Sequence, residues 1–589
     1  MCAQQEMNKK LFLLILIPCL LLIGAYSFIR QSMKADVKRN GENLSTETKT
    51  VDSSKTKETS SLDLRPLFVQ YLRQLVANTS NDFYDLSVGE MKVDVLSSTA
   101  TLHNVVLKPD KKRADSLNRL GLAPNETYVL SFQKLEVIGI NLDDVITEKT
   151  MNYKLVKLTN PVFEIYQGKN SSKGPKEDFT QRFLKEMKKL SVQNLVIEGG
   201  KIIIHKAGKK DNVLKNVSIN MKDILIDSTT RDDKDRFFFA ENANLSFTDY
   251  KTVIGKGGYD LTVAKVNVQV REQRVALSNL SLSLALSKEQ FSNKQEFSKE
   301  FYRLSFPSVI ITDVNWWNFI NEEEIIAKEI NVNSGKLFVY LDRSLTPRSK
   351  VGNFPQQLLM KLPVKINIER LKVNNLDLAY EEYNPVSQQS GTIKMNNVNL
   401  NIANVSNLNE KKPKPVTIDG TAMFMNKIPV KADFVFDREN HRSGKFTARI
   451  SFDKDFDGDL VNSFAMPMGL VKIEKGVLHK LTANLKGDQL QASGDVTLAY
   501  KDLKLLLLEK DKGEKKLDKK GVSTLFANTF VLKKDNPKKG EQLQKEQAVF
   551  KRIPEGGFFM LVWKTILTGA LKTVGAPTRI ANKTINASQ

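Results

Sequence analysis

The chain has 589 residues and 41% of them are hydrophobic, so a folded core can form and wholesale disorder is excluded. Lys and Arg number 89 against 67 Asp and Glu, and the formal net charge of +22 favours anionic partners such as lipid headgroups. The basic residues are mostly scattered Lys without an aromatic stripe, so we expect no nucleic-acid partner. The only cysteines, Cys2 and Cys19, precede the body of the chain, which excludes disulfides and zinc ribbons from it.

The N-terminal region predicts a membrane anchor. Residues 1–10 end in Lys9 and Lys10, and an unbroken apolar run follows at 11–29. About 18 residues at ~1.5 Å each give ~27 Å, which matches one bilayer core. A cleaved signal peptide and a lipoprotein signal at Cys19 are the alternatives, but no small-x-small cleavage site follows the run closely.

The orientation of this anchor follows from its position in the chain. A short, Lys-headed apolar segment at the N-terminus is typical of exported bacterial chains, although the basic residues on its far side argue for the opposite topology. We therefore expect a single pass through a bacterial inner membrane, with residues 1–10 in the cytoplasm and the bulk of the chain in the periplasm.

A tether and a helix come next. Residues 30–61 are rich in Lys, Thr, Ser and Glu and predict a flexible, solvated tether. Within 62–83, apolar residues recur at helical spacing from Leu64 to Val76, and Pro66 is well placed in a first turn. We expect an amphipathic helix that caps the end of a sheet.

Residues 84–508 alternate between apolar and polar side chains in many segments, such as "VKINIERLKVNNLDLAY". Alternation makes one face of each strand apolar and the other polar, whereas strands buried on both faces would be continuously apolar. The fold class predicted is therefore mainly β: an elongated, curved antiparallel β-sheet groove, with a few amphipathic helices and one N-terminal transmembrane helix.

A recurrent element within these strands is Asn, apolar, any residue, apolar. Asn tolerates the left-handed backbone conformation, so its repetition predicts bulges that bend the strands. Two longer stretches also match, "LSVQNLVI" from Leu190 and "LKVNNLDL" from Leu371, which indicates repeated units. The element occurs at Asn104 (a looser version), Asn216, Asn244, Asn279, Asn375 and Asn397.

The apolar positions of these segments are our candidate groove lining. Val373 and Leu376 share a face only if a bulge lies between them, which makes the proposed bend checkable. The candidates are Val192, Leu195, Leu280, Leu282, Val373, Leu376, Leu378, Val398 and Leu400.

Helical spacing interrupts the strands at Glu177–Leu190, at Ser287–Leu304 and at 354–362. Residues 509–550 predict a Lys-rich loop or extension. Residues 551–589 predict a C-terminal amphipathic helix and tail, with Lys564, Thr565, Thr568 and Lys572 on its polar face. This helix suits a membrane interface, and a helix docked on the sheet is the equal alternative. Its candidate membrane-contact residues are Phe559, Val562, Trp563, Ile566, Leu567 and Leu571.

Catalytic and metal-binding chemistry is not indicated. The acidic run from Asp453 to Asp459 opens like a calcium loop, but Phe464 stands where a bidentate carboxylate is needed. There is no nucleophile elbow, phosphate loop or acid–base pair. We expect a protein that is not an enzyme and that needs no cofactor or metal.

A sheet with one apolar face must cover that face. A second sheet or closure into a barrel would do so, and lipid chains on an open trough are the third solution. Exposing one CH₂ group to water costs about 0.8 kcal/mol, so an apolar path lowers the barrier to moving a lipid without any chemistry.

With these features the chain resembles AsmA-like proteins, the bacterial branch of the repeating β-groove, or bridge-like, lipid-transfer superfamily. The resemblance rests on the N-terminal anchor, the helix at Leu64 to Val76, the repeats, and the segment from Gly469 to Asp511. It implies a periplasmic protein, anchored in the inner membrane, that binds phospholipid acyl chains and moves phospholipid between envelope membranes, with an outer-membrane or periplasmic partner protein. The alternative is an envelope assembly or scaffolding factor that binds polypeptide clients.

Overall fold

A computed structural model describes residues 82–576 with internal gaps, together with single positions between 69 and 80. The gaps are at 95, 121–123, 125, 140–147, 168–187, 207–210, 231–232, 255–257, 323, 511–524 and 530–532.

Several predicted segments lie outside the described residues: the anchor at 11–29, the tether at 30–61, most of the helix at 177–190, and the tail at 577–589. The described positions between 69 and 80 are helical, as predicted for that region. Among the helices that the structure does describe, none has both the length and the apolarity needed to cross a membrane.

The chain is mainly β and divides into two compact units. Unit 1 holds Met1–Thr252, Val263–Val275 and Ile320–Glu322, and unit 2 holds Val253–Thr262, Ala276–Phe319 and Glu323–Gln589. The division passes through β9 (Asn242–Ile254), β10 (Tyr259–Gln269), β11 (Arg274–Ser283) and the π-helical turn η2 (Asn318–Glu322).

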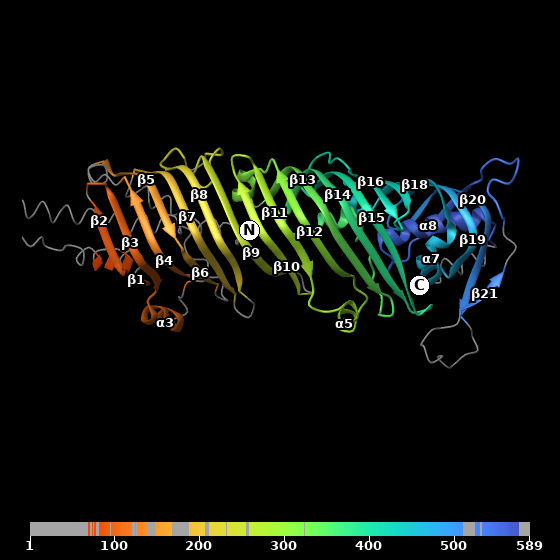
Figure 1. The fold of residues 1–589 in the computed structure, drawn as a ribbon, viewed down its shortest axis with the longest axis horizontal. Helices are drawn as coiled ribbons and strands as arrows, with labels where there is room; N and C mark the ends of the chain where they lie inside the picture. Colours follow the sequence, from red (N-terminus) through yellow and green to blue (C-terminus); the bar gives the residue numbers. More distant parts are fainter. Residues whose placement is uncertain are drawn as a thin grey trace, which may run out of the picture. The chain divides into compact units, whose positions relative to one another are not determined.

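Unit 1 contains a mixed sheet with few helical residues (Figure 1). Its elements are β1 (Tyr84–Ser87), β2 (Glu90–Asp94), β3 (Thr99–Pro109), α3 (Lys111–Arg119), β4 (Glu126–Ile138), β5 (Thr150–Thr159), β6 (Val162–Gln167), β7 (Lys189–Lys206), β8 (Asn212–Ile226) and most of β9. Strands β1 and β2 both pair with β3, and β3 pairs with β4. Helix α3 was missed in the sequence because none of its residues is buried and only two of them, Ala114 and Leu117, are apolar.

Unit 2 also has strands that pair in a mixed manner, and helices pack on them. Its strands are β12 (Phe301–Thr312), β13 (Glu324–Asp342), β14 (Lys365–Asn384), β15 (Gln389–Ser406), β16 (Val416–Phe424), β17 (Ile428–Phe436), β18 (Phe446–Asp457), β19 (Val471–Gly487), β20 (Gln491–Lys510), β21 (Leu525–Thr529) and β22 (Lys545–Lys551). Its helices are α5 (Lys288–Ser292), α6 (Pro355–Met360), η3 (His441–Ser443), η4 (Gly458–Val461), α7 (Asn462–Gly469) and α8 (Phe558–Thr573).

The prediction of a purely antiparallel sheet is wrong. Strand β7 runs parallel to β5 and β6, and β14 runs parallel to β13, while pairs such as β3–β4 and β14–β15 are antiparallel. Parallel neighbours require a crossover connection, and alternation along a strand carries no information about the direction of its neighbour. The two matching stretches "LSVQNLVI" and "LKVNNLDL" lie in β7 and β14, so both repeats begin at a parallel pair.

Two further predictions need correction. The helix expected over Ser287–Leu304 ends early, since α5 stops at Ser292 and β12 begins at Phe301. The extension expected at 509–550 contains β21 and most of β22, both of which pair with β20. The short helix expected near Phe354 is confirmed as α6, with Pro355 in its first turn.

The predicted bends at Asn are largely confirmed. Asn104, Asn216, Asn279, Asn375 and Asn397 all adopt a left-handed backbone with φ between 48° and 53°, whereas Asn244 does not. Strand β14 has one extra residue between Val373 and Leu376 relative to β15, and β15 has one between Met395 and Val398. The two bulges compensate, so the register is the same on either side of the bend.

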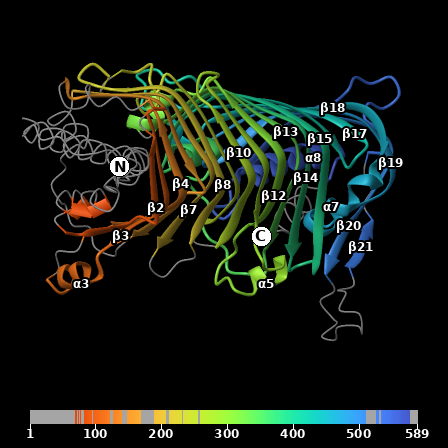
Figure 2. The ribbon, with the colours of Figure 1, turned by 60° about the vertical axis from the view of Figure 1, so that its left-hand side comes forward.

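This double bulge places the predicted apolar residues on one face of unit 2, which we call the apolar face. It is defined by the register of β12–β20 and includes Val309, Ile330, Val332, Leu337, Leu371, Val373, Leu376, Leu378, Met395, Val398, Leu400, Ile402, Ile418, Val430, Phe434, Ala448, Ile450, Leu481, Ala483, Leu485, Val496 and Leu498. The opposite face carries mostly polar pairs, such as Lys372 with Glu329 (2.9 Å) and Arg449 with Asn484 (3.2 Å). The strands of unit 2 bend along their length (Figure 2).

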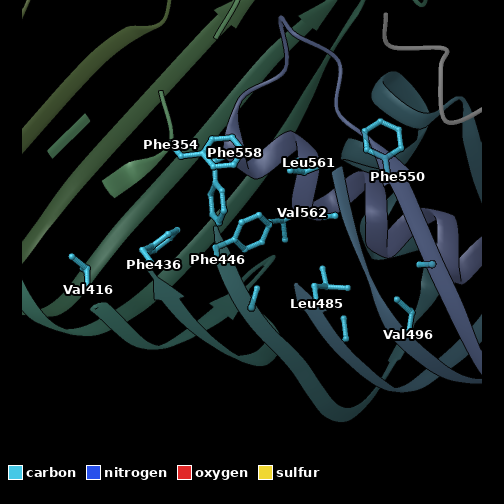
Figure 3. Close-up of a cluster of buried hydrophobic side chains, with 14 of the residues drawn as sticks. Phe354, Val416, Phe436, Phe446, Leu485, Val496, Phe550, Phe558, Leu561 and Val562 are labelled. Carbon is cyan, nitrogen blue, oxygen red and sulfur yellow. The ribbon is translucent and has the colours of Figure 1, made fainter. Parts of the chain in front are cut away.

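Helices cover one part of the apolar face. Phe558 at the start of α8 packs against Phe446 and Phe436, with ring centroids 4.9 and 5.2 Å away, and Phe354 from the β13–β14 crossover joins them (Figure 3). Further along α8, a Cβ on Gly569 would lie 2.4 Å from the Cβ of Val496 in β20. The absence of a side chain at Gly569 therefore lets the helix approach the sheet closely.

Candidate functional site

The structure brings five of the predicted lining residues together on β14 and β15. Val373 lies opposite Leu400, and Leu376 lies opposite Val398. Leu378 follows on the same face, opposite Met395. This arrangement confirms that Val373 and Leu376 share a face because a bulge separates them.

These five residues are not equally buried. Leu376 and Val398, beside the bulge, are each 5% exposed, whereas Val373, Leu378 and Leu400 are half-buried. The bend is held by polar contacts: Asn375 donates its backbone N–H to Asn399 Oδ1 (3.0 Å). The result is an apolar surface, partly open to solvent, supported by a fixed bend.

The other predicted lining residues lie elsewhere. Val192 and Leu195 belong to β7 of unit 1, and both are 0% exposed. Leu280 and Leu282 lie on β11 and are half-buried. Leu282 packs against a separate cluster that contains Tyr340, whose register places it on the face opposite to the apolar face.

That separate cluster gives Leu282 neighbours different from those of the lining residues on β14 and β15. Phe291 of α5 packs against Phe301 (ring centroids 5.6 Å), so a helix covers the otherwise polar face at this point. The pattern of Leu280 and Leu282 shows that they share a side of the strand, but it cannot show which element covers that side.

Helix α8 is docked on the sheet, which was the alternative to an interfacial membrane helix. Of its predicted membrane-contact residues, Val562 and Leu571 are buried, while Trp563, Ile566 and Leu567 are half-buried. Phe559 is 70% exposed. The side of the helix expected to be polar is not exposed to solvent, because Lys564, Thr565 and Thr568 are all buried.

The threonines can be buried because the helix satisfies their hydroxyl groups. Thr565 donates to the carbonyl of Leu561 (2.7 Å), and Thr568 donates to the carbonyl of Lys564 (2.8 Å). With these intrahelical hydrogen bonds made, a threonine adds little polarity to the contact with the sheet. The small-residue spacing of Thr565, Gly569 and Thr573 was the signal for close packing that the sequence reasoning missed.

Lys564 is buried beside a charged pair. Arg343 Nε forms an ion pair with Glu382 of β14, and the Tyr380 hydroxyl donates to Glu382 Oε2 (2.5 Å). Met560, one turn before Lys564, receives a contact from Arg343 Nη2 at 3.8 Å. Burial lowers the pKa of Lys564 to about 7; the charge of Arg343 also lowers it, and Glu382 acts in the opposite direction.

An apolar pocket of about 200 Å³ lies in unit 2 between α7 and α8. Trp563, Leu567 and Leu571 of α8 form one wall, and Phe464 of α7 contacts Trp563 edge-on (ring centroids 5.4 Å). Leu498 of β20, which belongs to the apolar face, lies on its floor. The sequence reasoning missed α7, since Pro467 inside it conceals the helical pattern.

Within the described part of the chain, no group of three or more His, Cys, Asp or Glu side chains is placed to hold a metal ion. The carboxylates of the acidic run at Asp453–Asp459 instead contact neighbouring strands, for example Asp455 with His479 Nδ1 (2.8 Å). The arrangement that stands out in unit 2 is therefore apolar: a face of the sheet that continues into a pocket.

No family model matches this chain, and no curated protein shows significant sequence similarity to it.

Proposed function

We propose that the protein is an AsmA-like periplasmic protein, anchored in the inner membrane by residues 11–29, whose apolar face binds lipid acyl chains. In this proposal the bent sheet acts as a groove that helps to move phospholipid between envelope membranes. The protein acts without catalysis and without a cofactor.

One observation carries the proposal: the apolar residues of β12–β20 stay on one face across a bend, and Val373, Leu378 and Leu400 on that face are only half-buried. A soluble protein gains stability by covering such a surface. At about 0.8 kcal/mol for each CH₂ group kept from water, an acyl chain is a ligand whose affinity grows with the length of the apolar path.

The net charge of +22 is consistent with this proposal, because a basic protein is attracted to anionic membrane surfaces. The opposite face of unit 2 carries charged side chains such as Lys372 and Arg449, so their charge lies away from the half-buried apolar residues.

Site-specific photocrosslinking tests the proposal. A benzophenone amino acid replaces either Leu400, on the apolar face, or Asn401, its exposed neighbour on the opposite face, in the full-length protein in its native envelope. We expect phospholipid adducts in severalfold excess at position 400, detected by mass spectrometry after purification. Equal yields at the two positions would contradict the proposal, and polypeptide adducts at position 400 would instead support the scaffolding alternative.

A further inference from the structure

The pocket between α7 and α8 is lined only by apolar residues, including Phe464, Leu498, Trp563 and Leu567. A buried water needs two to four polar partners, which this lining does not offer. A polypeptide backbone is equally unsuited, because each peptide unit carries an N–H and a C=O that need hydrogen bonds, so a polypeptide could enter only with an apolar side chain. The lining therefore selects an occupant without hydrogen-bonding groups.

The volume of the pocket limits the size of its occupant. A cavity of about 150 Å³ accommodates benzene, so a pocket of about 200 Å³ has room for about eight carbon atoms. That is the end of one aliphatic chain rather than a whole lipid. Leu498 belongs both to the lining of the pocket and to the apolar face, so the pocket lies against the same face of the sheet as the predicted lining residues of β14 and β15.

We propose that this pocket binds the methyl end of a single acyl chain, so that a lipid is held tail-first between α7 and α8. The inference rests on the proposed function and adds to it a defined end site for the chain. Trp563 and Leu567, predicted to contact a membrane, then contact lipid inside the protein.

The position of Trp563 in the wall provides the readout. The chain has three tryptophans, and replacing Trp316 and Trp317 by Phe leaves Trp563 as the only fluorophore of its kind. The probe is hexadecanoic acid with bromine either at the methyl end or at carbon 2, because bromine quenches tryptophan fluorescence on contact. We expect quenching by the methyl-end probe and little by the other. Equal quenching by both probes overturns the proposal.

A matched pair of glycine variants tests the pocket itself. A Cβ on Gly469 would meet only Val471 Cγ2, at 4.0 Å, so Gly469→Leu can fill the pocket from the α7 side. A Cβ on Gly557 would have its nearest contact at 3.9 Å, with Lys350, so Gly557→Leu is an equally tolerated control away from the pocket.

We expect Gly469→Leu to weaken binding of the methyl-end probe by at least tenfold, because each excluded methylene is worth about fourfold in affinity. Gly557→Leu should bind like the wild type. Thermal unfolding shows whether each variant is folded. If Gly469→Leu does not fold, Ala570→Phe replaces it, because Ala570 lines the pocket from the α8 side. Unchanged affinity in a folded filled variant overturns the proposal.

The two proposals fail separately. Lipid adducts at position 400 without quenching of Trp563 leave the proposed function standing and remove the end site. The absence of both removes the proposed function together with the end site.

Discussion

Strands β7–β8 of unit 1 and β14–β15 of unit 2 share a sequence motif but differ in how deeply it is buried. Both first strands begin at a parallel pair, and both change the side of their apolar residues in mid-strand. In unit 1 the motif residues Val192 and Ile197 are 0% and 1% exposed, whereas Val373 and Leu378 at the same motif positions of unit 2 are half-buried; the Leu between them, Leu195 or Leu376, is buried in both units.

This difference shows that an alternating pattern specifies the direction of a side chain but not the degree of its burial. The two motifs have the same spacing and comparable apolar residues, so their strands alone would give the same exposure. Contacts from other elements also contribute, as for the part of the apolar face that α8 covers. A candidate binding surface is therefore better recognised by exposed apolar residues than by the motif.

The largest expected effect separates the two motifs by stability. Leu195→Ala should lower the local free energy of unfolding by about 3 kcal/mol, as for a fully buried leucine, and Leu378→Ala by about 1 kcal/mol, since part of its side chain already contacts solvent. Hydrogen exchange of β7–β8 and β14–β15 measures each value separately.

Leu96→Ala serves as the control for this pair, because Leu96 is fully exposed and its truncation should change neither value. Equal losses for Leu195→Ala and Leu378→Ala would show that the two motifs are equally buried in solution. This result would contradict the half-buried apolar face on which the proposed function rests.

The fold was predictable where the signal is local. Alternation identified the strands, and the left-handed tolerance of Asn located the bulges at Asn375 and Asn397. Parallel pairing was not predictable, because it depends on where a crossover such as 343–364 returns the chain. The five lining residues on β14 and β15 followed from the bulges, whereas the neighbours of Leu282 depend on how α5 packs against Phe301 and Tyr340, which the alternation does not show.

The sequence also could not predict which face of α8 packs against the sheet, because that face carries a lysine. A lysine on a helix normally indicates the solvent side, yet Lys564 is 0% exposed beside Arg343 and Glu382. These two long-range neighbours help to determine its environment, and neither can be inferred from the spacing of residues 558–573.

The second prediction uses this lysine to compare the part of the apolar face under α8 with the open part. The pKa of Lys564 is about 7 in the folded protein and 10.5 in the absence of burial, so between these values the unfolded chain binds more protons. Stability should therefore rise with pH, by about 2 kcal/mol between pH 7 and pH 9 from this residue alone. Lys564→Met should abolish this rise and be more stable at pH 7.

Urea unfolding of the wild type and the variant at pH 7, 8 and 9, followed by tryptophan fluorescence, measures the difference. Lys572→Met is the matched control, because Lys572 is an exposed lysine on the same helix. It should keep the dependence on pH of the wild type. A wild-type pH dependence that persists in Lys564→Met would mean that Lys564 is not buried and that α8 does not cover the sheet in solution.

The smallest expected effect distinguishes how the two motifs bend. In unit 2 the left-handed residue is Asn375 itself, while in unit 1 Asn194 is not left-handed and Asp223, on the neighbouring strand β8, is. A left-handed residue with a Cβ costs about 1 kcal/mol, and Asn bears less of this cost than Ala does. Asn375→Ala should then lower the local free energy of unfolding by about 1 kcal/mol, and Asn375→Gly should not lower it.

Hydrogen exchange of β14–β15 measures both values. Asn194→Ala is the matched variant in unit 1, where the loss of stability should be smaller. Equal losses for Asn375→Ala and Asn194→Ala would mean that the backbone bend in β14 does not depend on Asn375, so the bulge that places Val373 and Leu376 on one face would have to be fixed by the pairing of β13, β14 and β15 instead.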